Sequence, residues 1–166
     1  MTASDKPSSQ PPPQQLKVHS AFTIFFAICL AGWSGWYWWF TAIAAKNNDM
    51  KGLIVFVLTG FFLLIIGIIG IVFVLIRRRS FVLKWSIINV VMFVMGIIEL
   101  ALCIETYLHC DNPALHLFDF ICKMEDTRYF WLPCAGQIFI NICCFSLGFS
   151  LWKRWGDSDK KVQNYY

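Results

Sequence analysis

Charged residues are scarce in this sequence, and their scarcity excludes a water-soluble fold. Only 14% of the 166 residues are charged and 58% are hydrophobic, whereas soluble domains carry about 25% and about 45–50%. A soluble domain of this size has too little interior to bury so much apolar surface. We therefore expect lipid to cover it.

A continuous basic surface is missing as well. The net charge of +4 arises from 14 basic and 10 acidic residues, and the basic residues stand beside apolar segments. Nucleic-acid binding needs a basic face on a folded soluble domain. The sequence therefore predicts no nucleic-acid partner.

Catalytic signatures are the third absence. The seven cysteines include no Cys-x-x-Cys pair, which a membrane-embedded, quinone-linked thiol enzyme needs. The adjacent Cys143 and Cys144 do not replace such a pair. The sequence therefore predicts no enzyme and no cofactor.

What the sequence does contain is four long apolar runs, at residues 21–45, 52–76, 83–106 and 129–152. Each reaches the length of about 20 residues that a helix needs to cross a hydrocarbon core of about 30 Å. Because lipid offers the backbone no hydrogen-bond partners, each run must be helical. The predicted fold class is all-α, a polytopic four-transmembrane-helix bundle over residues 19–153.

The distribution of Lys and Arg predicts how these spans are oriented. Ten of the 14 basic residues lie in or beside the tails 1–18 and 154–166 and the link 77–82, and four lie in or beside the loops 46–51 and 107–128. We therefore expect both termini in the cytosol. The two loops are then outer loops, the first very short and the second longer and cysteine-bearing.

The N-terminal tail is polar and rich in Pro, Ser and Gln. Such a segment buries too little apolar area to offset its ordering entropy, so we expect it to be disordered. No cleavage-site pattern closes the first apolar run. We therefore expect a retained signal anchor and not a cleaved signal peptide.

Glu99 lies near the middle of the third span, where an ionised carboxylate costs at least about 2.5 kcal/mol. We expect it to face the bundle interior, with Gln137 of the fourth span as its hydrogen-bond donor and Thr59 of the second at a comparable depth. Asn89 and Asn141 are the other intramembrane polar residues. Glu99 either handles a proton or ion, contacts a partner's polar group, or makes only an interhelical hydrogen bond worth about 0.6–2 kcal/mol.

Two cysteines, Cys110 and Cys122, lie in the longer outer loop, in a compartment that permits disulfides. A bridge between them would stabilise the loop by about 3 kcal/mol. Cys103 and Cys134, near the outer ends of the third and fourth spans, are a second candidate pair. The others are expected to be buried thiols: Cys29, Cys143 and Cys144.

The same loop holds residue types that zinc accepts. They are His109, Cys110, Asp111, His116, Asp119 and Cys122. Their spacing matches no compact zinc pattern, and thiolates on the outer side tend to oxidise. The sequence therefore predicts no metal site.

Small residues recur at helical spacing in the first two spans. Ala27, Ala31 and Gly35 follow one another every four residues, and Gly60 and Gly67 lie in the second span. Small residues let helix backbones approach closely. They predict helix packing, either within the bundle or with a partner.

The first span also concentrates aromatic residues, with four tryptophans between residues 33 and 39. A ligand-binding aromatic box is one interpretation of this cluster. Packing and lipid contact near the membrane interface explain it better.

Three consecutive arginines, Arg77, Arg78 and Arg79, stand at the membrane edge between the second and third spans. Each basic group near an anionic leaflet contributes about 1 kcal/mol, so the run is a candidate site for lipid headgroups. Topology control alone would also explain it.

The layout resembles that of the small tetraspan families, chiefly tetraspanins and the MARVEL type. These share four helices, cytosolic ends, a short basic link between the second and third spans, and a cysteine-bearing loop before the fourth. An acidic residue in the third span, like Glu99, also occurs in tetraspanins. The resemblance implies a role in organising membrane domains, chaperoning partner proteins or shaping junctions and vesicles.

The departures from these families are specific. The outer loop lacks the Cys-Cys-Gly signature of tetraspanins and is far shorter, and the first outer loop is too small for the Trp…Gly-Leu-Trp…Cys…Cys pattern of claudins. No family's binding residues are therefore carried over to this sequence.

Three functional hypotheses follow. The first is a membrane scaffold or accessory subunit that holds partner membrane proteins, or a second copy, by lateral helix contacts. The second is a small transporter or channel subunit that uses Glu99, and the third a membrane-embedded thiol or metal enzyme. We expect the plasma membrane or an endosomal or secretory-pathway membrane.

Overall fold

The computed structural model describes residues 13–112, 117–124 and 128–163. All the regular structure in these residues is helical: α1 (Pro13–Lys46), α2 (Met50–Ile76), α3 (Arg79–Leu108), the short 3-10 helix η2 (Ile121–Lys123) and α4 (Arg128–Gln163). The predicted all-α fold with four long helices is confirmed.

Each long helix contains a segment long and apolar enough to cross a membrane: Leu16–Lys46, Met50–Ile76, Arg79–Leu108 and Phe130–Gly156. The shortest of these has 27 residues, which is about 40 Å of helix. The chain is therefore a multi-pass membrane protein with four spans.

The helices are longer than the predicted spans. α1 begins at Pro13, inside the tail that the sequence predicts to be disordered, and residues 1–12 of that tail lie outside the described residues. α4 continues to Gln163. The physical reason is that a span prediction finds only the lipid-covered length, whereas backbone hydrogen bonding carries a helix on past it.

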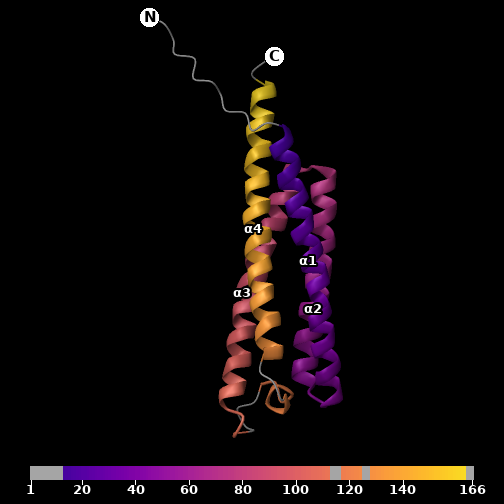
Figure 1. Cartoon of the computed structure of the whole chain (residues 1–166), viewed down its shortest axis with the longest axis vertical. Coiled ribbons are helices and arrows are strands. Elements are labelled where there is room, and N and C mark those ends of the chain that lie inside the picture. The colour runs from indigo at the N-terminus through magenta and orange to yellow at the C-terminus, as the bar shows by residue number, and fades with distance from the viewer. Residues whose placement is uncertain (1–12, 113–116, 125–127, 164–166) are drawn as a thin grey trace, which may run out of the picture.

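The four long helices lie side by side in one elongated bundle, with the start of α1 and the end of α4 at the same end (Figure 1). We call this the terminal end, and it also carries the tight link Arg77–Arg78 between α2 and α3. The opposite end, here the loop end, carries the turn at residues 47–49 and residues 117–124 of the connection between α3 and α4.

Helix packing is uneven. α1 packs extensively against α2 and α3 against α4, α1 also contacts α4, and α2 and α3 touch only sparsely. On α1 the buried residues recur three and four apart, as Thr23, Ala27, Leu30, Ser34, Tyr37, Phe40 and Ala44. This spacing is typical of a helix seam, and it directs one side of α1 into the bundle.

Candidate functional site

A buried polar cluster receives one side chain from each long helix. Its members are Tyr37 of α1, Thr59 of α2, Glu99 of α3 and Gln137 of α4, and none is more than 6% exposed. Buried polar groups in a membrane protein are expensive unless they are hydrogen-bonded to one another. The cluster is therefore the part of the interior in which chemistry is most concentrated.

Hydrogen bonds connect the cluster across the bundle. The Thr59 hydroxyl donates to Glu99 Oε1, and the Tyr37 hydroxyl donates to Gln137 Oε1. Gln137 Nε2 donates in turn to the Met92 carbonyl oxygen of α3, at 3.4 Å. α2 is thereby bonded to α3, and α1 is bonded through α4 to α3.

The sequence placed Glu99, Thr59 and Gln137 at similar depths, and the structure brings all three into the cluster. The donor to Glu99 differs from the expected one, because it is Thr59 and not Gln137. The two ends of the Gln137 amide are already engaged by Tyr37 and by the Met92 carbonyl oxygen.

One atom of the cluster is left over. Glu99 Oε2 is fully buried and has no hydrogen-bond partner among the described residues. A buried acceptor without a donor costs about 1–3 kcal/mol. Glu99 Oε2 is therefore the point at which this cluster would take up a proton or meet a further donor.

Asn89 and Asn141 do not join the cluster through the bonds that their side chains make. Each is fully buried and donates its amide to the carbonyl of the residue four positions earlier in its own helix, Trp85 and Gln137 respectively. The oxygens Oδ1 of both asparagines also lack a partner in the described part of the chain. They extend the polar lining of the α3 and α4 interior.

Tyr37 is the member that sequence reasoning missed. Its neighbours in the sequence are the tryptophans of residues 33–39, which suggest an interfacial aromatic residue, although Tyr37 is completely buried. Its position seven residues after Leu30, with Ser34 between them, was the available signal, because that spacing continues the buried face of α1.

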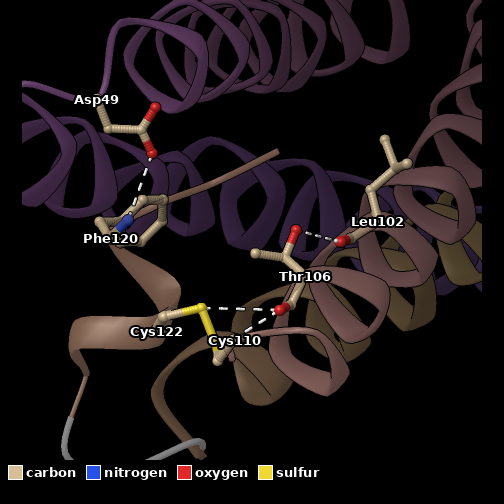
Figure 2. The surroundings of a disulfide bond; sticks show 6 residues. All are labelled: Asp49, Leu102, Thr106, Cys110, Phe120 and Cys122. Atoms are coloured by element: carbon tan, nitrogen blue, oxygen red, sulfur yellow. Dashed lines mark hydrogen bonds between the residues drawn. A yellow bond between two sulfur atoms is a disulfide. The ribbon is translucent and has the colours of Figure 1, made fainter. Parts of the chain in front are cut away.

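The disulfide between Cys110 and Cys122 is present, as predicted, with a Cα–Cα distance of 5.5 Å. Figure 2 shows both sulfurs beside the Thr106 carbonyl oxygen in the last turns of α3, at 3.4 and 3.7 Å. The bridge fixes the segment after α3 to that helix, and it leaves neither sulfur as a thiolate. Cys103 and Cys134, the second candidate pair, are buried free thiols.

Asp49 joins the two connections at the loop end. It is the N-cap of α2, where its carboxylate accepts from Gly52 N at 2.9 Å. The other carboxylate oxygen faces Phe120 N of the longer loop, at 3.4 Å (Figure 2). One buried acidic side chain therefore holds both loops.

Aromatic rings close this end. Phe118 and Phe120 of the longer loop are fully buried, and their rings lie 5.3 and 5.5 Å from that of Phe56 in α2. The Phe120 ring also lies 6.0 Å from that of Phe40 in α1. We call these four residues the aromatic cap. No helical period or motif in the sequence predicts this cap.

No group of three metal-ligating side chains occurs in residues 13–112, 117–124 and 128–163. Of the loop residues considered for zinc, His116 lies outside these ranges. Cys110 and Cys122 are bonded to each other.

The predicted small-residue positions separate into two groups. A Cβ atom at Gly67 would lie 2.7 Å from Ala31 N and 2.8 Å from Ala27 O, so α2 rests directly on the backbone of α1 there. Gly60 similarly faces Tyr37. Gly35 does not take part, because a Cβ added to it meets nothing within 4 Å.

Gly35 instead belongs to an open groove on the outer side of α1. Gly32 and Gly35 form its floor, and Trp36 and Trp39 line it. The two tryptophans are 39% and 40% exposed. Positions 32, 35, 36 and 39 share one face of a helix, and this face points away from the rest of the chain.

The three arginines have three different surroundings. Arg79 is held by α4, since its Nε donates to the Trp152 carbonyl oxygen at 3.1 Å and its guanidinium lies 4.7 Å from the Trp152 ring. The guanidinium of Arg78 lies 5.6 Å from the Phe81 ring. Arg77 is exposed and has left-handed backbone angles, φ 55° and ψ 33°.

Comparison with known proteins supports the membrane class and assigns no activity. No protein-family model and no solved structure matches the chain significantly. An uncharacterized transmembrane protein of Dictyostelium discoideum is 26% identical over 112 residues, which cover 68% of this chain and 81% of that protein. The likeness to tetraspanins and MARVEL proteins therefore remains one of layout.

Proposed function

We propose that this four-span protein is a non-enzymatic scaffold or accessory subunit that binds a transmembrane helix of a partner protein in the groove on α1. The observation that carries the proposal is the open floor formed by Gly32 and Gly35 between exposed tryptophans. In this reading both chain ends face the cytosol, in the plasma membrane or a membrane of the endosomal and secretory pathway.

The chain itself supplies the precedent for such a contact. Within the bundle, α2 reaches the backbone of α1 by placing Gly67 on Ala27 and Ala31. Small residues at helix interfaces in membranes allow this close approach, which gains dispersion energy and weak backbone contacts. On the groove face the same kind of floor is available, and no helix of the described chain covers it.

The tryptophans strengthen the case for a protein occupant. Trp36 and Trp39 pack edge to face, with ring centroids 5.7 Å apart, so they present a rigid wall. Aromatic walls contribute about 0.5–1.5 kcal/mol per favourable ring pair beyond their buried area. A partner helix with a small or aromatic residue at the matching position would contact both the glycines and the tryptophans of the groove.

Filling the groove tests this proposal. Gly35→Leu adds a side chain where no neighbour lies within 4 Å, so the bundle should fold normally. Ala101→Leu is the matched control, since Ala101 is exposed on α3. A photo-crosslinking residue at position 35, and separately at position 101, would report which membrane protein sits beside each face.

We expect a crosslinked adduct with one membrane protein from position 35 and none from position 101. The same partner should be lost when Gly35→Leu is purified in mild detergent, and it should co-purify with Ala101→Leu. If the crosslinked species were a second copy of this chain, the groove would be a homodimer interface and not a site for a partner protein, which would contradict the proposal. Adducts of equal yield from both positions, or none, would contradict the proposal.

A second function is favoured by the buried polar cluster, namely transport of a proton or small cation through Glu99. Supporting it are the convergence of polar side chains from all four helices and the unpartnered Glu99 Oε2. Glu99→Gln should abolish flux in proteoliposomes while preserving insertion. Glu105→Gln, on the exposed face of α3, is the control, and unchanged flux in Glu99→Gln removes Glu99 from this role.

A further inference from the structure

A second groove opens at the terminal end of the bundle, between the start of α1, the end of α2 and the last part of α4. Its volume is about 420 Å³, within the range of about 300–1,000 Å³ usual for small-ligand sites. Lys17, Ser20 and Arg77 contribute its polar atoms, and Ile24, Val74 and Trp155 belong to its apolar wall.

The groove is positively charged. Lys17 and Arg77 both line it, and no acidic side chain is among its lining residues in the described chain. Both cationic side chains are exposed. Neither side chain makes a hydrogen bond or ion pair within the described residues, whereas the guanidinium groups of the neighbouring Arg78 and Arg79 lie against Phe81 and Trp152.

The backbone of Arg77 is a second, independent observation. A non-glycine residue with left-handed angles is uncommon, and at the end of a helix this position is usually glycine. Arg77 adopts φ 55° as the C-cap of α2, with its N–H donating to the Val74 carbonyl oxygen. Backbone outliers of this kind cluster at functional sites, and this makes the Arg77 side chain a candidate for a binding role.

We propose that this groove binds an anionic glycerophospholipid. The lipid phosphate lies between the side chains of Lys17 and Arg77. One acyl chain follows the apolar wall of Ile24 and Val74 into the bilayer, and Trp155 stands at the level of the headgroup. Tryptophan at that level is usual in membrane proteins.

Continuity with the bilayer argues for a lipid and against a free anion. The apolar wall belongs to the helices that cross the membrane, since Ile24 lies in the span Leu16–Lys46 and Val74 in the span Met50–Ile76. A soluble phosphate would use the two cations and leave that wall uncovered. A phospholipid covers both parts at once.

Native mass spectrometry of the purified full-length protein in detergent tests the assignment. Phosphatidylserine and phosphatidylcholine with identical acyl chains are titrated separately, and inorganic phosphate is added as a competitor. We expect saturable binding of phosphatidylserine at least about tenfold tighter than that of phosphatidylcholine, and no displacement by millimolar phosphate.

Matched variants distinguish lipid binding in the groove from lipid binding through net positive charge. Lys17→Gln with Arg77→Gln removes two charges from the groove, and Arg78→Gln with Lys84→Gln removes two exposed charges nearby. The first pair should weaken phosphatidylserine binding about tenfold or more, and the second pair should have little effect. Equal losses in both pairs would overturn the site, because binding would then follow net charge alone.

Two further variants guard against misfolding as the explanation. Ala21→Trp keeps both charges and fills the groove, and it should lower phosphatidylserine binding. Arg77→Gly removes the cation at a position whose backbone angles suit glycine. It should lose lipid binding while its unfolding temperature stays at or above that of the parent protein. Displacement of the lipid by inorganic phosphate would show a plain anion site and contradict the proposal.

Discussion

The two ends of the bundle are built on opposite principles. At the loop end, a disulfide, a buried carboxylate and the aromatic cap hold the connecting segments against the helices. At the terminal end, the groove lined by Lys17 and Arg77 remains open, and two cations there have no protein partner in the described chain. The buried polar cluster lies between the two ends.

This difference separates a fixed end from an end suited to binding. Buried rings and a covalent link restrict residues 117–124 of the longer loop, so this part of the loop end acts as a rigid reference for the helices. Exposed cations beside an apolar wall keep their binding capacity for the membrane or its lipids. The predictions below alter one end, or the cluster between the ends, and are ordered from the largest expected effect to the smallest.

Removing a ring from the aromatic cap should be the most damaging change. Phe120→Ala empties a fully buried site between Phe40 and Phe56, and such truncations cost about 3–5 kcal/mol. Thermal unfolding in detergent micelles measures the loss. Phe61→Ala, at a residue that is 49% exposed, should cost far less, and equal losses would show that the cap is not a core.

Opening the disulfide comes next. Cys110→Ser with Cys122→Ser should destabilise the protein by about 3 kcal/mol, because the loop between them regains its freedom in the unfolded state. Hydrogen exchange should rise in residues 117–124 and remain low in the α1–α2 interface. A reductant should reproduce the effect on the parent protein and leave the double variant unchanged. If a reductant lowered the stability of the double variant further, a different disulfide would be responsible.

The cluster between the ends should respond to loss of a single hydroxyl. Thr59→Val keeps the side-chain shape and deprives Glu99 Oε1 of its donor, at a cost of about 1–3 kcal/mol. Thr41→Val is the control, since the Thr41 hydroxyl donates only within its own helix, to the Tyr37 carbonyl oxygen. Comparable unfolding temperatures for the two variants would mean that the bond to Glu99 adds nothing.

At the terminal end the expected effect is small and of opposite sign. Arg77→Gly should stabilise the protein by about 1 kcal/mol, because glycine adopts left-handed angles without strain. Lys84→Gly should destabilise it by about 0.5–1 kcal/mol, since Lys84 is exposed inside α3 and glycine weakens a helix interior. Unfolding midpoints of the two variants, measured without added lipid, decide the matter. A lower unfolding midpoint in both variants would refute backbone strain at Arg77.

The membrane class and the number of spans followed from the sequence because length and apolarity are local properties. Four apolar runs whose backbone finds no hydrogen-bond partners in lipid must be helical, and the structure has four such helices in its described residues. The Cys110–Cys122 bridge was also within reach, since the sequence predicts few cysteines in a compartment that oxidises them. The depth match between Glu99, Thr59 and Gln137 needed only antiparallel helices of known rise.

What the sequence did not reveal depends on how helices rotate against one another. Tyr37 looked interfacial within a run of tryptophans, and only the packing of α1 shows that it points inward. The aromatic cap depends on a loop folding back, which no helical period encodes. The approach of Lys17 to Arg77, 60 positions away, needs three helices in place.

The shared polar cluster also bears on biogenesis. Tyr37 donates to Gln137, and the Trp33 indole N–H donates to the Pro133 carbonyl oxygen at 2.9 Å, so two donors of the first helix find their acceptors only in the last one. Until translation delivers that helix, both would face lipid or a chaperone. These two unsatisfied donors would therefore distinguish an incomplete chain from a complete one during membrane insertion.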